Sequence, residues 1–159
     1  MTSDVRKALT AIDCIYDDLV EVANEIFNTT TKEVDGMMTD AYNDIEKMSN
    51  DAIRDLMLKL SLKSYTFSEV KEKSAFKSTM GEILRKEAYA KNFNSIEGTV
   101  AVRETNATIQ TSGEIIAEEI YTLVANMLKT KLDEIHRVVN TLQTVLMTRI
   151  QEAKLTTVG

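Results

Sequence analysis

The sequence contains no proline and no tryptophan, and only five of its 159 residues are glycine. Proline and glycine dominate the tight turns that connect β-strands, so their scarcity argues against a turn-rich sheet protein. Residues that favour helices, such as Lys, Glu, Ala, Leu and Met, are abundant instead. We therefore expect an all-α fold of three or four helices with a long C-terminal helix, arranged as a helical bundle or a coiled-coil assembly.

Residues that carry catalytic or metal chemistry are also scarce. The single cysteine, Cys14, excludes an intrachain disulfide, and its place among apolar residues predicts an inert core thiol in a reducing compartment. The single histidine, His136, has no histidine or cysteine at the helical spacing of metal ligands. Neither Gly81 nor Gly98 is followed by the Lys-Ser or Lys-Thr pair of a phosphate-binding loop. We expect no enzyme, no cofactor and no metal.

The sequence also lacks a long apolar run. No window approaches 18 consecutive apolar residues, and the N-terminus has no basic stretch followed by an apolar core. These features predict a soluble protein with no membrane partner, located in the cytoplasm. For a viral protein this would be the host cytoplasm, or the virion if the protein is structural.

Charge is distributed unevenly along the chain. The net charge is −6, yet residues 1–56 hold five basic and thirteen acidic side chains, whereas residues 57–104 hold nine basic and six acidic ones. In this middle segment the basic residues alternate with Tyr65, Phe67, Phe76, Tyr89 and Phe93. That combination is typical of proteins that bind phosphates electrostatically and stack bases on aromatic rings. The alternative interpretation places the aromatic side chains in the core and the lysines on an ordinary solvated face.

The spacing of apolar residues predicts where the helices lie within a single domain, 1–159. A first helix is expected from Ser3 to about residue 27 and a second from residue 31 or 39 to 62, with a possible interruption at residues 49–51. Together, residues 1–60 form acidic N-terminal helices. Residues 61–68 alternate polar and apolar side chains, which indicates a connection or a short extended piece. A basic helix then runs from residue 68 through Phe76, Met80, Ile83 and Leu84, and a turn at residues 92–99 includes the Gly-Thr pair 98–99.

The C-terminal helix is expected from Thr99 to about Lys154, with a local kink or a close-packing position at Gly113. Its apolar stripe covers some fifty residues, more than one preceding helix of about 25 residues can cover. Part of the stripe must therefore pack against the N-terminal helices or against another copy of the chain. We expect a homo-oligomer whose interface includes Ile135, Val139, Leu142, Val145, Leu146 and Ile150.

Three segments share a layout with known phage proteins: EILRKEAYAK at 82–91, GTVAVRE at 98–104, and LQTVLMTR at 142–149. Over residues 59–154 this layout resembles small helical proteins of tailed phages, in particular the UvsY family of recombination mediators. The resemblance implies an oligomer that binds single-stranded DNA and helps load a recombinase onto strands covered by single-strand-binding protein. It implies phosphate contacts at Lys71, Lys73, Lys77, Arg85, Lys86 and Lys91, and an assembly surface at Leu142, Val145, Leu146 and Ile150. The acidic residues 1–56 have no counterpart in that layout.

Three functional hypotheses follow. The first is a non-enzymatic, self-assembling helical protein that binds single-stranded nucleic acid, as a recombination mediator does. The second is a structural virion or scaffold component built from packed long helices. The third is an adaptor or inhibitor that uses the acidic N-terminal helices to bind a protein partner.

Overall fold

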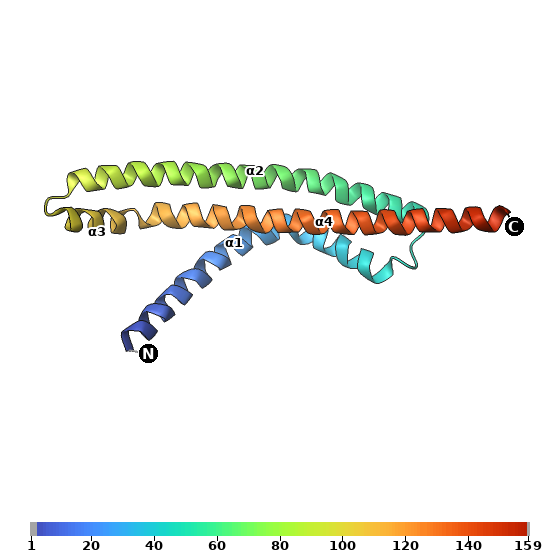
Figure 1. Ribbon diagram of the computed structural model, residues 1–159, viewed down its shortest axis with the longest axis horizontal. Coiled ribbons are helices and arrows are strands. Elements are labelled where there is room, and N and C mark those ends of the chain that lie inside the picture. Colours follow the sequence, from blue (N-terminus) through green and yellow to red (C-terminus); the bar gives the residue numbers. More distant parts are fainter. Residues whose placement is uncertain (1–2, 159) are drawn as a thin grey trace. The chain divides into compact units, whose positions relative to one another are not determined.

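The computed structural model describes the backbone of residues 3–158 and the side chains of residues 17–156. The described backbone forms four helices: α1 (Ser3–Asp44), α2 (Asn50–Ser95), α3 (Val100–Gln110) and α4 (Ser112–Val158) (Figure 1). No strand occurs among residues 3–158. This confirms the expected all-α fold with a long C-terminal helix. Cys14 lies outside the described side chains, so its predicted core position is not addressed.

Two predicted helix breaks are wrong. Helix α1 continues through residues 28–31, where Thr31 is fully buried one turn before the buried Val34. Helix α2 likewise continues through residues 61–68, because Leu60 and Phe67 are buried seven residues apart on the same side of the helix. In both places packing outweighs local preference, since most of a helix's stability comes from the face that it buries.

The actual interruptions have local causes. Helix α1 ends at Asp44, and the Ser49 hydroxyl accepts a hydrogen bond from the Ala52 amide at 3.1 Å to cap α2. The predicted turn before residue 99 is present: Gly98 adopts a positive φ of 129°, and the Thr99 side chain caps α3. The predicted long helix is divided at Thr111, which lies between α3 and α4, two residues before Gly113.

Contacts within the chain define two compact units. Unit 1 comprises residues 1–27 and 71–126, and unit 2 comprises residues 28–70 and 127–159. Helices α1, α2 and α4 each contribute to both units.

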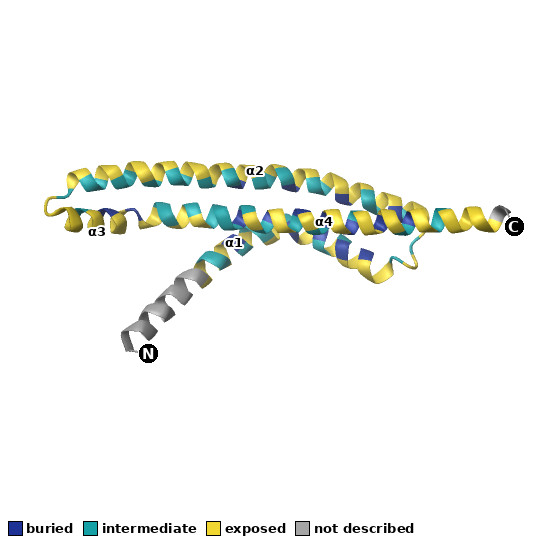
Figure 2. Ribbon diagram, in the orientation of Figure 1, coloured by how far each residue is buried: buried dark blue, intermediate teal, exposed yellow. Residues whose placement is uncertain are grey.

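Unit 2 is a three-helix arrangement of the second part of α1, the first part of α2 and the second part of α4. Its core is formed by large apolar side chains from all three helices, and Figure 2 shows the buried positions along these segments. The core residues are Val34, Met38, Ala41, Ile53, Leu60, Phe67, Leu132, Ile135, Val138, Leu142 and Leu146. Burial of this apolar surface is the main stabilising contribution to unit 2.

The described part of unit 1 contains residues 17–27, the second part of α2, α3 and the first part of α4. The chain reverses at Gly98, so α2 runs antiparallel to α3 and α4 (Figure 1). The side chains buried here are mostly small or polar: Ala23, Ser74, Ala107, Thr111 and Val124. Unit 1 therefore differs from unit 2 in the composition of its interior.

Candidate functional site

Among the six basic side chains predicted to bind phosphate, Lys71, Arg85 and Lys86 form ion pairs within the chain. Arg85 Nε lies 2.7 Å from Glu118 Oε2 on α4, Lys71 Nζ lies 2.7 Å from the neighbouring Glu72, and Lys86 pairs with Glu82 one turn earlier. The hydrogen bond to Glu118, together with its charge, raises the pKa of Arg85. The hydrogen bond from Lys86, followed by its charge, lowers the pKa of Glu82.

The six basic residues do not share one face of α2. At 100° per residue, Arg85 lies on the side that contacts α4, Lys86 lies on one flank, and Lys73, Lys77 and Lys91 lie on the opposite flank. Lys73, Lys77 and Lys91 are exposed. The Lys77 ammonium lies 4.8 Å from the centroid of the Tyr121 ring, within cation–π range. The structure thus brings three of the six together along one flank of α2.

The aromatic side chains of the basic segment divide between core and surface. Phe67 is buried in unit 2, whereas Tyr65 and Phe76 are exposed. Tyr89 and Phe93 stack with ring centroids 6.2 Å apart, and the Arg103 guanidinium lies 4.1 Å from the Phe93 centroid. The alternative that the aromatic side chains of this segment lie in the core is therefore correct for Phe67 and wrong for Tyr65 and Phe76.

The residues predicted to form an oligomer interface lie in or against the core of unit 2. Ile135, Leu142 and Leu146 are buried against side chains of α1 and α2, and Val139, Val145 and Ile150 pack around them while partly buried. Ile135, Leu142 and Leu146 are therefore covered within a single chain, whereas Val139, Val145 and Ile150 stay partly exposed.

The helix contact inside unit 1 is made by polar and small groups. The hydroxyls of Ser78 and Thr122 are hydrogen-bonded at 2.7 Å. Arg85, about two turns further along α2, reaches Glu118, which lies one turn before Thr122 on α4. Between them Gly81 lies so close to α4 that a Cβ atom there would be 3.2 Å from the Glu118 Cα. At these positions the two helices are joined by hydrogen bonds and by one close approach of the backbones.

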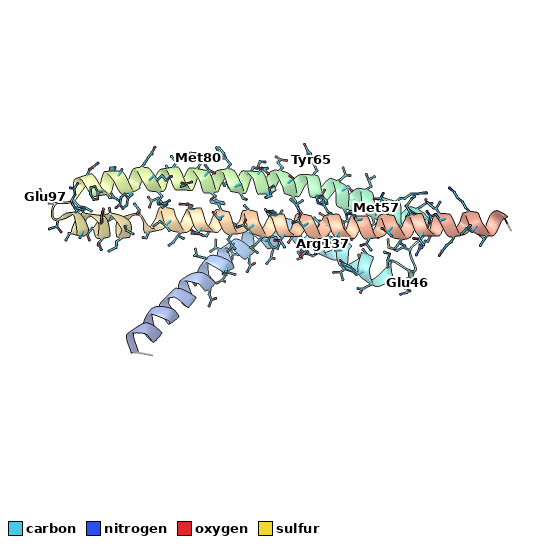
Figure 3. All side chains as sticks on the ribbon, in the orientation of Figure 1. Glu46, Met57, Tyr65, Met80, Glu97 and Arg137 are labelled. Carbon is cyan, nitrogen blue, oxygen red and sulfur yellow. The ribbon has the colours of Figure 1, made fainter. Side chains whose placement is uncertain are left out.

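Several large apolar side chains between residues 76 and 84 of α2 are exposed on the side away from this contact. Four of them form one stripe, which we call the outer face of α2: Phe76, Met80, Ile83 and Leu84, with exposed fractions of 65, 39, 44 and 52%. Their spacing of four, three and one residues places them within about 100° of arc on the helix. Figure 3 shows Met80 on the side of α2 that is turned away from α4. Unit 1 therefore exposes the kind of side chain that unit 2 buries.

Sequence reasoning missed this arrangement, although the signal was present. The inward positions Ser74, Ser78, Gly81 and Arg85 recur at spacings of four, three and four residues, which is the periodicity of a helix interface. Apolar spacing does not reveal them, because these positions carry small or polar side chains. The carbonyl contacts of Arg149, described below, were also missed, since they join residues about one hundred positions apart.

Unit 2 contains a groove of about 540 Å³ between α1 and α2. Its apolar lining includes Met37, Met48, Leu56 and Leu62, and its acidic and basic groups are largely paired with each other, as in Asp55 with Lys59 at 2.6 Å. The other lining residues are Glu33, Asp40, Ala52 and Lys63. The groove offers apolar contact and no arrangement of a nucleophile with a base.

No group of three His, Cys, Asp or Glu side chains that could hold a metal ion is found where the structure describes side chains. His136 is exposed on α4. Within the described residues, no helix combines the length and apolar character that a membrane crossing requires. Comparisons with protein-family models, curated proteins and solved structures found no match.

Proposed function

We propose that this chain is a non-enzymatic helical protein that self-assembles, as a structural or scaffold component does. The observation that supports the proposal is the packing of unit 1, where polar and small side chains occupy the helix contact while Phe76, Met80, Ile83 and Leu84 are exposed to solvent. Contiguous exposed apolar side chains on a helix are characteristic of interaction surfaces, because their burial is favourable by about 25 cal/mol per Å². Assembly of copies would supply that burial.

The test is the oligomeric state of the full-length chain, measured by light scattering coupled to size exclusion over a range of concentrations. We expect a discrete oligomer or a filament for the wild type and a smaller species for Phe76→Glu. Met147→Glu provides the matched control, since Met147 is an exposed apolar residue of unit 2 that lies outside the outer face of α2. A wild type that is monomeric at every concentration would contradict the proposal.

A second candidate function is binding of single-stranded nucleic acid, as implied by the resemblance to phage recombination mediators. The exposed lysines Lys73, Lys77 and Lys91 on one flank of α2 favour it, and Lys77 lies beside the Tyr121 ring. Non-specific single-strand binders combine basic side chains that follow the phosphate backbone with aromatic rings on which bases stack. The ion pairs formed by Lys71, Arg85 and Lys86 reduce the number of cations available for phosphate.

The two candidates give different results with a labelled single-stranded oligonucleotide. Nucleic-acid binding predicts co-elution that weakens as salt rises, and a loss of binding in the double variant Lys73→Glu with Lys77→Glu. The control variant is Lys129→Glu, at an exposed lysine of α4 in unit 2. An oligomer that does not bind the oligonucleotide even at low salt would reject nucleic-acid binding, and assembly would be the candidate function that remains.

A further inference from the structure

The outer face of α2 has charges of opposite sign at its two ends. Glu72, Thr79 and Lys86 are spaced seven residues apart, which is close to two helical turns, so they follow one edge of the face. The side chains of Glu72 and Lys86 are 68 and 65% exposed. Thr79 lies midway between them and is exposed. The edge is therefore acidic at one end, neutral in the middle and basic at the other.

We propose that a second copy of this chain binds to the outer face of α2 through its own α2, antiparallel, around a two-fold axis close to Thr79. The inference rests on the proposed assembly function and specifies its surface and geometry. In an antiparallel pair centred there, Thr79 lies opposite Thr79 of the second copy, and Glu72 lies opposite Lys86 of the second copy. The two-fold axis repeats the Glu72–Lys86 contact at the other end.

The apolar side chains fit the same centre. Phe76 lies opposite Ile83 of the second copy, and Met80 lies beside its own equivalent, so the two stripes cover each other. Lys73 and Glu87 lie beyond the two ends of the apolar stripe along the helix, and in the antiparallel pair Lys73 faces Glu87 of the second copy, which adds a second complementary pair. A parallel pair would place Glu72 against Glu72 and Lys86 against Lys86, and juxtaposed like charges are unfavourable. Charge complementarity therefore selects the antiparallel arrangement of two copies.

The ion pairs seen within one chain do not oppose this arrangement. Glu72 pairs with Lys71 and Lys86 pairs with Glu82, and Glu72, Lys86 and Glu82 are each more than 40% exposed. Exposed ion pairs of this kind contribute little free energy because water already solvates both charges. Exchange of an intrachain partner for one on the second copy therefore costs little, while the apolar contacts provide the gain.

Crosslinking tests the geometry directly. In a full-length Cys14→Ser background, Thr79→Cys is treated with a short bifunctional maleimide, and we expect a covalent dimer on a denaturing gel. Asn94→Cys is the matched control, since Asn94 is exposed on α2 and lies along the same helical direction as Phe76. In the antiparallel pair the two Asn94 positions are far apart and do not crosslink, whereas in a parallel pair they would meet. Crosslinking at position 94, with or without crosslinking at 79, would overturn the inference, because a parallel pair brings both positions against their equivalents.

Charge reversal provides an independent test in sedimentation equilibrium at low salt without nucleic acid. We expect Glu72→Lys alone and Lys86→Glu alone each to weaken association by about 3- to 30-fold, because each creates like-charge contacts at both ends of the pair. The double variant restores the pairing with reversed signs, so its association constant returns to within about 3-fold of the wild type. A double variant that is weaker than both single variants would argue against the antiparallel pair.

The outcomes separate this inference from the proposed function. A wild type that stays monomeric contradicts both the assembly function and the antiparallel pair. A monomer is the result expected if another part of the same chain covers the outer face of α2. An oligomer that is lost in Phe76→Glu, but shows no crosslink at Thr79 and no rescue by double charge reversal, leaves assembly in place and rejects the antiparallel pairing.

Discussion

Gly81 on α2 lies against the backbone of Glu118 on α4. A Cβ atom at position 81 would be 3.2 Å from both the Cα and the Cβ of Glu118, closer than ordinary van der Waals contact. Because the opposing atoms include backbone, they cannot rotate away as a flexible side chain would. This close approach also brings Glu118 within 2.7 Å of Arg85, so the glycine and the ion pair belong to one contact.

Replacement of Gly81 by leucine is therefore expected to force α2 and α4 apart in unit 1. We expect a loss of about 1–3 kcal/mol in the free energy of unfolding, the usual cost of overpacking a tight contact. Urea unfolding followed by circular dichroism gives the total change. Amide hydrogen exchange around residues 74–88 and 111–122 would show whether the loss is confined to unit 1.

The control for this prediction is Gly36→Leu. Gly36 also lies within a helix, but a Cβ there meets nothing within 4 Å. Removal of a helical glycine gives up to about 1 kcal/mol of stabilisation through the lower entropy of the unfolded chain. Gly36→Leu should therefore be neutral or stabilising. Equal effects at the two glycines would mean that the Gly81 contact is not tight in solution.

Truncation of Leu142 tests whether its side chain belongs to the core of one chain. Leu142 is fully buried in unit 2, so Leu142→Ala should cost about 2–5 kcal/mol of unfolding free energy. Met147→Ala, on the exposed side of the same helix, should change it by less than about 0.5 kcal/mol. The measurement is chemical unfolding at two protein concentrations. If Leu142→Ala changed only the dependence on concentration, Leu142 would instead lie in a contact between copies.

The fold class was predictable because composition and helical spacing act over the whole chain. Absence of proline, few glycines and repeated apolar spacing point to long helices regardless of the packing partner. The helix ends were harder to predict. The threonines at 29–31 favour a break on local grounds, yet burial of Thr31 and Val34 keeps α1 helical. That burial depends on residues from α2 and α4, which the local sequence does not reveal.

The position of the apolar surface was less predictable for a related reason. An apolar stripe shows that a helix has a face to bury, but it does not show which partner buries it. The stripe containing Leu142 is covered by α1 and α2, whereas the one containing Phe76 is left exposed because α2 contacts α4 through Ser78 and Gly81. Self-association remains a prediction, and the structure moves its candidate surface from α4 to α2.

Arg149 links the C-terminal part of α4 to the residues that follow α1. Its guanidinium donates hydrogen bonds to the backbone carbonyls of Ile45 at 2.8 Å, Glu46 at 3.0 Å and Met48 at 2.5 Å. Carbonyls at and just beyond a helix C-terminus have no helical partner, and the helix dipole favours a cation there. We expect Arg149→Met to lower the unfolding free energy by about 1–3 kcal/mol.

The conservative variant Arg149→Lys separates charge from geometry. Lysine keeps the positive charge but lacks the planar fork that reaches three carbonyls at once, so an intermediate loss is expected. Amide exchange at residues 45–53 should accelerate in the same order, from wild type through lysine to methionine. An Arg149→Lys variant as stable as the wild type would show that charge alone is sufficient at this helix end.

Lys131 should make the stability of unit 2 depend on alkaline pH. Burial lowers the pKa of this lysine, but hydrogen bonds to Glu134 at 2.7 Å and Asp35 at 2.9 Å outweigh burial, and the pKa is raised above its ordinary value of 10.5. A raised pKa in the folded state means that the protonated form is favoured by folding. The resulting stability is fully present below pH 10.5 and is lost as the pH rises through the folded-state pKa.

The variant Lys131→Met removes this contribution at every pH. At pH 8 we expect it to be less stable than the wild type by about 1 kcal/mol, and the difference should shrink as the pH rises above 10.5 through the folded-state pKa of Lys131. Urea unfolding across this range provides the measurement, with Lys129→Met as the control for the loss of one lysine on the same helix. A difference that stays constant up to the alkaline end would mean that the ion pairs of Lys131 with Asp35 and Glu134 do not raise its pKa in solution, since stability depends on pH only where the folded-state and unfolded-state pKa values differ.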